Sequence, residues 1–148
     1  MTIFIGADHR GFELKNNLIE YLQEKNIRVE DLGNHQYDPL DDYPDYAQRV
    51  TEAVLQNVKD FLGIVICGSG HGVATAANRF KGIYCGLGFD GDQIKHMREN
   101  DHINILALPA EYIDLEKAKT FVDVFLKTKP LLQEKYLSRL KKIDKEIL

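Results

Sequence analysis

The chain of 148 residues has only two cysteines, no tryptophan and no apolar run that approaches the length of a membrane span. Two cysteines are too few for a disulfide scaffold, and the apolar runs are too short for a transmembrane helix. Acidic residues (23) outnumber lysine and arginine (19), which gives a formal net charge of −4. A general nucleic-acid binder would have a basic excess. We therefore expect neither a nucleic acid nor a membrane as a partner.

The composition is that of an ordinary globular domain, with 44% hydrophobic and 28% charged residues. This length fits one domain spanning residues 1–148. The first apolar run begins at Thr2, which leaves no room for a signal peptide and favours a cytoplasmic location. Cys67 would close one strand and Cys85 would open the next, roughly 15 Å apart in a parallel sheet. A disulfide needs Cα atoms within about 7 Å, so we expect two free thiols.

Strand-like and helix-like segments alternate along the whole chain. Residues 44–57 and a segment starting at Asp114 carry helical periodicity, as do the leucines at positions 14, 18 and 22. Apolar β-type runs cover residues 3–7, 27–32, 63–67, 83–87 and 103–108. This alternation predicts a three-layer α/β fold with a five-stranded, mostly parallel, Rossmann-like sheet and helices on both faces. An extra C-terminal helix is expected over residues 130–148.

The most informative motif is Cys67-Gly68-Ser69-Gly70-His71-Gly72. It follows a buried strand and precedes a helix-like stretch. Alternating glycines allow positive φ and expose backbone N–H groups, which can cradle an anion. Val73 stands where a dinucleotide fingerprint needs glycine, and no lysine follows as in a P-loop. The alternative interpretation is a tight strand-to-helix turn with an inert buried cysteine.

Polar residues follow the ends of two predicted strands. Asp8 and His9 follow the first strand, whereas Cys67 and Ser69 end the third. Ligands of open parallel sheets bind outside the carboxyl ends of the strands. If these two strands are neighbours, the four side chains converge on one crevice. The irregular segment 33–43 is a candidate loop on the substrate side.

The predicted C-terminal helix has an apolar stripe and a basic face. Its basic residues are Lys135, Arg139 and Lys142, and its apolar stripe consists of Tyr136, Leu140, Ile143 and Ile147. A solvated surface helix explains such a pattern. The alternative is that the stripe packs on a second subunit and delivers a phosphate clamp to that subunit's crevice.

Several segments together resemble the ribose-5-phosphate isomerase B and galactose-6-phosphate isomerase family. They are Gly6–Phe12 with Leu14-Lys15, Asp42–Ala47, Cys67–Gly72, Ala76–Arg79 and Asn100–Asn104. The resemblance implies an aldose–ketose isomerase of phosphorylated sugars that uses no metal and no cofactor. It also implies a homodimer or a dimer of dimers, in which C-terminal helices reach into the partner's site.

The resemblance also implies catalytic roles. Cys67 matches the base that removes the C2 hydrogen of the sugar, and Ser69 matches a hydroxyl residue that handles protons on the sugar oxygens. Asp8 belongs to the same catalytic set. The enediolate intermediate would be stabilised by backbone N–H groups, which the turn supplies through Gly68, Gly70, His71 and Gly72.

Substrate-binding roles follow from the same resemblance. His9, like Asp8, matches a residue that contacts the sugar ring and the phosphate end, and Tyr43 and Asn100 match residues that line the site. Arg139 falls where an arginine reaches the phosphate bound to the neighbouring subunit. Lys135 stands where a second phosphate-binding arginine is usual, so a point charge replaces a bidentate fork.

Glu99 is the main departure from the family pattern, which usually has a ring-opening histidine there. A carboxyl group of raised pKa could act instead, or Glu99 could be a surface residue and His96 or His102 could substitute. The arginine that is frequent at position 84 is replaced by Tyr84. The reaction expected first is ribose 5-phosphate to ribulose 5-phosphate. The alternatives are an isomerase of allose 6-phosphate or galactose 6-phosphate, and a sugar-phosphate-binding protein with weakened catalysis.

Overall fold

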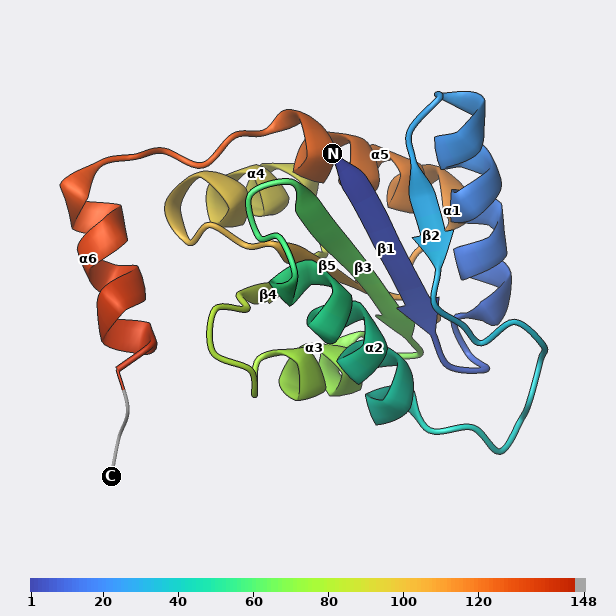
Figure 1. Ribbon diagram of the computed structural model, residues 1–148. Helices are drawn as coiled ribbons and strands as arrows, with labels where there is room; N and C mark the ends of the chain where they lie inside the picture. The colour runs from blue at the N-terminus through green and yellow to red at the C-terminus, as the bar shows by residue number, and fades with distance from the viewer. Residues whose placement is uncertain (146–148) are drawn as a thin grey trace.

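The sheet has five strands in the order β2-β1-β3-β5-β4, and every neighbouring pair is parallel (Figure 1). The computed structural model describes residues 1–145. The strands are β1 (Thr2–Ala7), β2 (Val29–Asp31), β3 (Phe61–Cys67), β4 (Cys85–Leu87) and β5 (Ile105–Pro109). The predicted α/β fold is confirmed, although β2 and β4 are shorter than the apolar runs that predicted them.

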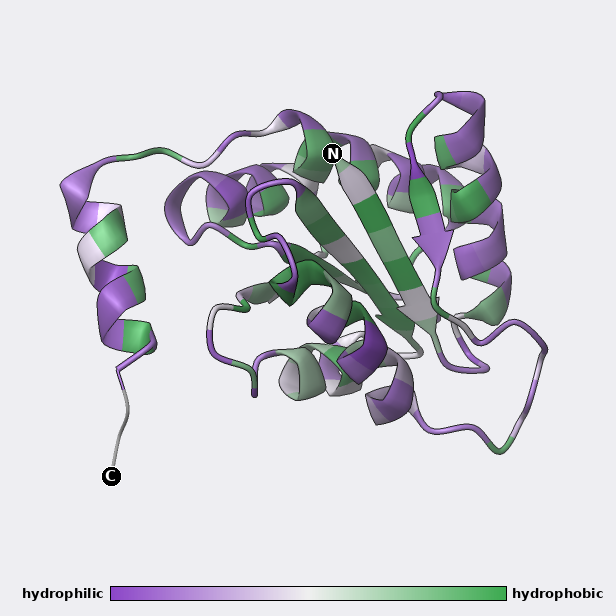
Figure 2. Ribbon diagram, viewed as in Figure 1, coloured by the Kyte–Doolittle hydropathy of each residue, from purple (hydrophilic) through white to green (hydrophobic). Residues whose placement is uncertain are grey.

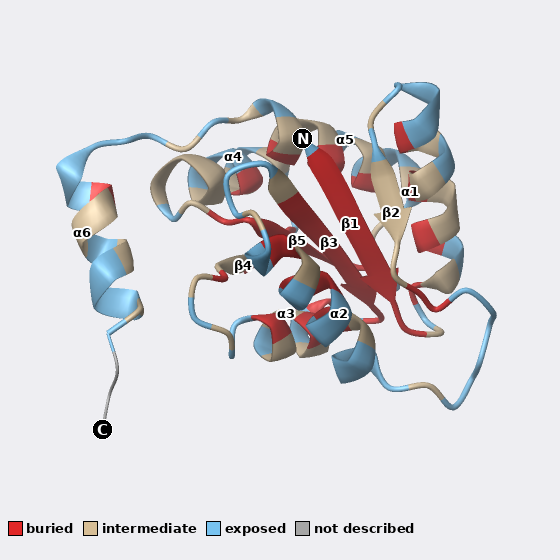
Figure 3. Cartoon of the chain, in the orientation of Figure 1, coloured by how far each residue is buried: buried red, intermediate tan, exposed pale blue. Residues whose placement is uncertain are grey.

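Helices cover both faces of the sheet (Figure 1). On one face lie α1 (Phe12–Glu24), α4 (Gly91–Asn100) and α5 (Leu115–Lys127), and on the other lie α2 (Tyr43–Leu55) and α3 (His71–Ala77). Ile64 and Ile66 of β3 pack into the first core and Val65 into the second. A strand that is buried on both faces must be apolar throughout. This requirement explains the green, buried central strands (Figures 2 and 3).

Two helices begin where local residue preferences predict that they should. Asp114 caps α5, because its side chain accepts a hydrogen bond from the backbone N–H of Lys117 at 2.8 Å. Pro44 lies in the first turn of α2, where the missing N–H has no helical partner to lose. These two helices therefore begin close to the predicted positions.

The C-terminal helix is shorter than predicted. Helix α6 covers Glu134–Ile143, and residues 128–133 before it form neither helix nor strand. There the backbone N–H of Leu131 donates to the carbonyl of Glu99 at 2.9 Å, which holds this segment to the end of α4. The expected residues 146–148 of this helix, Ile147 included, lie outside the described residues.

Helix α6 lies apart from the other helices, beyond the β4 side of the sheet (Figures 1 and 3). Of its predicted apolar stripe, Tyr136 is buried, but Ile143 is 64% exposed. The stripe is therefore only partly covered within one chain. The hydroxyl of Tyr84 donates to the carboxylate of Asp144, which ties the end of α6 to the body.

Candidate functional site

The neighbouring strands β1 and β3 bring their carboxyl ends together, as the crevice prediction requires. Ala7 pairs with Ile66, and the N–H of Asp8 donates to the carbonyl of Ile66 at 3.3 Å. A cavity of about 390 Å³ opens at this point, a size typical of small-molecule sites. The predicted site residues that line it are Asp8, His9, Tyr43, Cys67, Gly68, Ser69 and Gly72.

Cys67 lies at the base of this cavity, at the last position of β3, and is only 5% exposed. The chain continues from it into the turn, and Ala110 donates its N–H to the Cys67 carbonyl at 2.9 Å. Both cysteines are free, as expected. Cys85 lies elsewhere, and burial raises the pKa of its thiol. The cavity therefore presents one thiol, that of Cys67.

The glycine-rich turn differs in detail from the prediction. Of its three glycines only Gly70 has a positive φ, of 72°. Gly72 is needed for space, because a Cβ there would lie 2.8 Å from the Tyr43 ring. Within residues 1–145, the N–H groups of Gly68, Ser69 and Gly70 have no protein acceptor. The turn thus presents unpaired main-chain donors at the cavity, as an anion cradle requires.

Asp8 is a buried carboxyl group beside this turn. Its Oδ1 accepts hydrogen bonds from the N–H groups of Arg10 at 3.0 Å and Gly11 at 3.2 Å. Burial raises the pKa of Asp8 and outweighs these donors and the neighbouring His9, which act in the opposite direction. Asp8 is therefore held in a fixed orientation at the cavity wall and takes up a proton more readily than an exposed aspartate.

His9 is held by Asp41, a residue that the sequence reasoning missed. The backbone N–H and the ring Nδ1 of His9 lie 2.9 and 2.8 Å from the same carboxylate oxygen of Asp41. The side-chain amide of Asn34 donates to the other oxygen at 2.6 Å. The predicted substrate-side segment 33–43 does reach the cavity, through Asp41, Asp42 and Tyr43, the last of which begins α2.

Glu111 and Tyr112 also line the cavity, because they follow the carboxyl end of β5. The strand-end rule that selected Asp8 would have found them if it had been applied to this strand. Arg10, another lining residue, forms an ion pair with Glu111 at 3.1 Å. Arg10 is the only lysine or arginine among the described residues that line this cavity. Its positive charge is partly neutralised by Glu111 at the cavity mouth.

Glu99 and Asn100 lie far from this cavity within one chain. They end α4, which leads back to the amino ends of the strands, just before β5. The amide of Asn100 contacts the ring of His96 at 2.9 Å, and the ring of His102 contacts the carbonyl of Leu131 at 2.8 Å. The predicted ring-opening candidates therefore gather at the opposite end of the sheet.

Lys135 and Arg139 are exposed on α6 and do not line the cavity of their own chain. Both cationic groups lie over the ring of Tyr136, at 4.8 and 5.9 Å from its centroid. The side chain of His71 is exposed as well, and its ring lies 3.4 Å from the hydroxyl of Thr75 on the outside of α3. Gly70 does not line the cavity.

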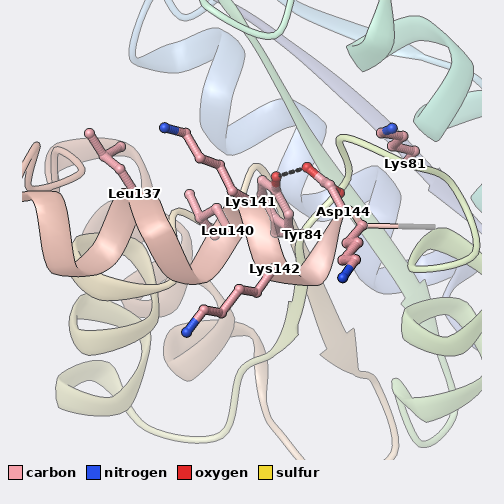
Figure 4. Close-up of a pocket in the computed structure, with 8 residues that line it drawn as sticks. Lys81, Tyr84, Leu137, Leu140, Lys141, Lys142 and Asp144 are labelled. Carbon is pink, nitrogen blue, oxygen red and sulfur yellow. Dashed lines mark hydrogen bonds between the residues drawn. The ribbon is translucent and has the colours of Figure 1, made fainter. Parts of the chain in front are cut away.

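A second, wider cavity of about 670 Å³ lies between α6 and the body of the protein (Figure 4). Lysines surround it, including Lys81, Lys141 and Lys142, and Tyr84 and Asp144 join across it. Burial and the bond to Asp144 raise the pKa of Tyr84. Among the described residues that line this second cavity there is no thiol or histidine, whereas Asp8, Cys67 and Ser69 line the first cavity.

No helix within residues 1–145 is long and apolar enough to cross a bilayer. No group of three or more histidine, cysteine, aspartate or glutamate side chains in this range is arranged to hold a metal ion.

Fold and cavity together define a doubly wound α/β protein. Its site lies at the carboxyl ends of the strands and combines a thiol, a histidine held by a carboxylate and unpaired backbone N–H groups. The family model described as Ribose/Galactose Isomerase matches residues 3–143, so the chain belongs to this isomerase family. The resemblance drawn from the sequence motifs is thereby confirmed.

Curated relatives agree with this family. A probable ribose-5-phosphate isomerase B of Mycoplasma pneumoniae is 42% identical over 124 residues, which cover 84% of this chain and 81% of the relative. The ribose-5-phosphate isomerase B of Mycobacterium leprae is 34% identical over 130 residues, covering 86% and 78%.

Solved structures of the family have the same fold. The ribose-5-phosphate isomerase B of Mycoplasma genitalium with bound ribulose-5-phosphate superimposes with a TM-score of 0.92 at 37% identity, covering 97% of this chain and 93% of that one. The ribose 5-phosphate isomerase of Thermotoga maritima superimposes with a TM-score of 0.91 at 41% identity, covering 97% of each chain.

Proposed function

We propose that this protein interconverts ribose 5-phosphate and ribulose 5-phosphate. The observation that carries the proposal is the position of the Cys67 thiol, which lies in one cavity with the unpaired N–H groups of the glycine-rich turn. The similarity to ribose-5-phosphate isomerases over most of the chain supports this choice of substrate.

In the proposed reaction Cys67 acts as the base. The thiolate removes the hydrogen from C2 of the open-chain aldose, and the electron pair moves through C1 to the carbonyl oxygen. The resulting enediolate accepts hydrogen bonds from the backbone N–H groups of Gly68 and Ser69, which line the cavity, each worth roughly 3 kcal/mol by analogy with oxyanion holes. Cys67 then returns the proton to C1, so that the carbonyl group ends at C2. Ser69 moves protons between the two sugar oxygens.

The remaining contacts are assigned by chemistry. Asp8 faces the sugar hydroxyls, and Tyr43 packs over Gly72 at the wall of the cavity. His9 and Arg10 are the cationic or potentially cationic groups at this cavity, and we assign the phosphate to their side. In this proposal no metal ion or cofactor takes part.

We further propose that the working unit is a homodimer, or a dimer of dimers, with shared sites. Lys135 and Arg139 are exposed on α6 and leave their own cavity untouched. Glu99 and Asn100 lie at the opposite end of the sheet from their own Cys67. In the proposed assembly these four residues complete the cavity of the neighbouring subunit.

The first experiment is a coupled assay of the purified protein on ribose 5-phosphate, allose 6-phosphate and galactose 6-phosphate. Wild type is expected to act on ribose 5-phosphate, and Cys67→Ala to lose about 10²- to 10⁴-fold in rate, as for removal of a general base. Cys85→Ala is the matched control, because Cys85 lies outside the cavity. Turnover of a hexose phosphate alone would overturn the choice of substrate, and an active Cys67→Ala would overturn the choice of base.

The shared site has its own test, which is to mix two inactive variants. Random reassortment of Cys67→Ala with Arg139→Ala subunits leaves one intact site in each mixed dimer, so about a quarter of the wild-type activity should return. Mixtures that stay as inactive as their components, despite subunit exchange, would place Arg139 outside the neighbouring site.

A further inference from the structure

The contact between His9 and Asp41 determines which ring nitrogen of His9 faces the cavity. An ionised carboxylate can only accept hydrogen bonds, so the ring nitrogen that lies 2.8 Å from Asp41 must carry a hydrogen. That nitrogen is Nδ1. The other ring nitrogen, Nε2, has no hydrogen-bond partner within residues 1–145. Nε2 is therefore left available at the cavity wall that His9 forms.

Asp41 is itself fixed by the start of its own loop. Its second carboxylate oxygen accepts from the amide of Asn34 at 2.6 Å, and both side chains are almost completely buried. Asn34 is joined to the end of β1, because its N–H donates to the carbonyl of Ala7 at 3.1 Å. In return, the N–H of Ala7 donates to the carbonyl of Gly33 at 2.9 Å. The carboxylate thus connects His9, which follows the end of β1, with Asn34 at the start of the loop.

We propose that Asp41 is a positioning residue for His9: it fixes the ring in the tautomer with hydrogen on Nδ1 and directs Nε2 toward an anionic or hydroxyl oxygen of the substrate. The tautomer assignment rests on the contacts alone, whereas the effect on the substrate rests on the proposed sugar-phosphate isomerase function. Nothing in the sequence pattern assigns Asp41 a role. A histidine without this partner can present either nitrogen and rotate between them.

The first readout is the tautomer of His9, measured by long-range ¹H–¹⁵N correlation NMR on the ligand-free protein with ¹⁵N-labelled histidine. The signals are assigned by their loss in His9→Gln. In the neutral ring of wild-type His9 we expect hydrogen on Nδ1. In Asp41→Ala we expect that preference to be lost. Hydrogen on Nε2 in wild type would overturn the proposal, whether or not any variant folds.

The second readout is the split between KM and kcat. Asp41→Ala is expected to raise KM for the sugar phosphate about 10- to 100-fold, as for loss of the group that orients a binding histidine, with a smaller change in kcat. Asp41→Asn keeps one acceptor oxygen and should recover part of the loss. Unchanged KM in a folded Asp41→Ala variant, or a fall in kcat alone, would overturn the proposal.

Asp38→Asn is the matched control. It removes one negative charge from the same loop, at an exposed residue whose carboxylate accepts, among residues 1–145, only the nearby N–H of Leu40. The His9 tautomer and the KM of this variant should equal those of wild type. If either changes as much as in Asp41→Ala, the charge of the loop and not the contact with His9 is responsible for the effect, and the proposal is wrong. If wild type turns over no sugar phosphate, the proposed function fails while the NMR result still decides the tautomer.

Discussion

An ion pair between Lys15 and Asp31 lies at the start of the loop that carries Asp41. We predict that removing one partner lowers the free energy of unfolding more than removing the other. The ammonium group of Lys15 lies 2.7 Å from the carboxylate of Asp31, and the Lys15 side chain is 0% exposed whereas that of Asp31 is 28% exposed. The other oxygen of Asp31 accepts the N–H of Gly33 at 2.9 Å, at the start of the loop. We therefore expect Asp31→Asn to be the costly change and Lys15→Met the tolerated one.

The magnitude follows from what each variant leaves behind. Asp31→Asn leaves a fully buried ammonium group without its counter-ion, and breaking a buried pair in this way costs about 3–5 kcal/mol. The side chain of Asn16 at 3.0 Å and the ring of Phe12 at 5.6 Å still face Lys15, so we take the lower end, about 3 kcal/mol. Lys15→Met leaves a partly hydrated carboxylate and an apolar side chain of similar length, which costs about 1 kcal/mol.

Urea unfolding monitored by circular dichroism measures both free energies of unfolding. Thermal unfolding gives a second measure, because 1 kcal/mol corresponds to about 3 °C in Tm for a domain of this size. We expect Tm to fall by about 9 °C for Asp31→Asn and by about 3 °C for Lys15→Met. The double variant Lys15→Met/Asp31→Asn should be more stable than Asp31→Asn alone, since no buried charge remains. The reasoning is refuted if Asp31→Asn costs no more than Lys15→Met.

The pKa directions and the thiol environments give three further predictions. Because burial raises the pKa of Asp8, ionisation of this group lowers the free energy of unfolding as pH rises above 3.8. The unfolding free energy of Asp8→Asn minus that of wild type should therefore increase between pH 3 and pH 7, and a difference that stays constant would contradict this. Burial opposes the ionisation of Asp123, but hydrogen bonds from Lys25 and from a tyrosine hydroxyl outweigh it and lower the pKa. The loss of unfolding free energy in Asp123→Asn, measured by urea titration, should therefore be complete at pH 7 and shrink as pH falls below 3.8. Iodoacetamide near neutral pH should modify Cys67, which lines the cavity, before Cys85, because burial raises the pKa of the Cys85 thiol. The reverse order in peptide mass spectrometry would contradict the assignment of Cys67 as the reactive thiol.

The sequence carries its fold in local patterns. The run from Ile64 to Ile66 is apolar at every position because both of its faces are buried, and that continuity identifies a central parallel strand. The Cys67–Gly72 motif is local as well, since one glycine supplies a positive φ and another leaves room for Tyr43. Six consecutive residues therefore located the thiol and its main-chain donors.

The contact of Asp41 with His9 could not be predicted in the same way. The two residues are 32 positions apart, and the loop between them has no periodicity that fixes its path. The limits of α6 were missed for a related reason, because a tertiary hydrogen bond from Leu131 to Glu99 engages the preceding segment, which is not helical. Long-range contacts of this kind outweigh local helix preference.

The sequence by itself determined the alternation of strands and helices, the position of the reactive turn and the family to which the chain belongs, since these depend on short-range patterns. Only the tertiary structure decided that β1 lies beside β3, so that Asp8, His9 and Cys67 share a cavity while Glu99 lies at the other end of the sheet. The physical reason is that strand order is set by how the helices pack across both faces of the sheet, and no local segment encodes that packing.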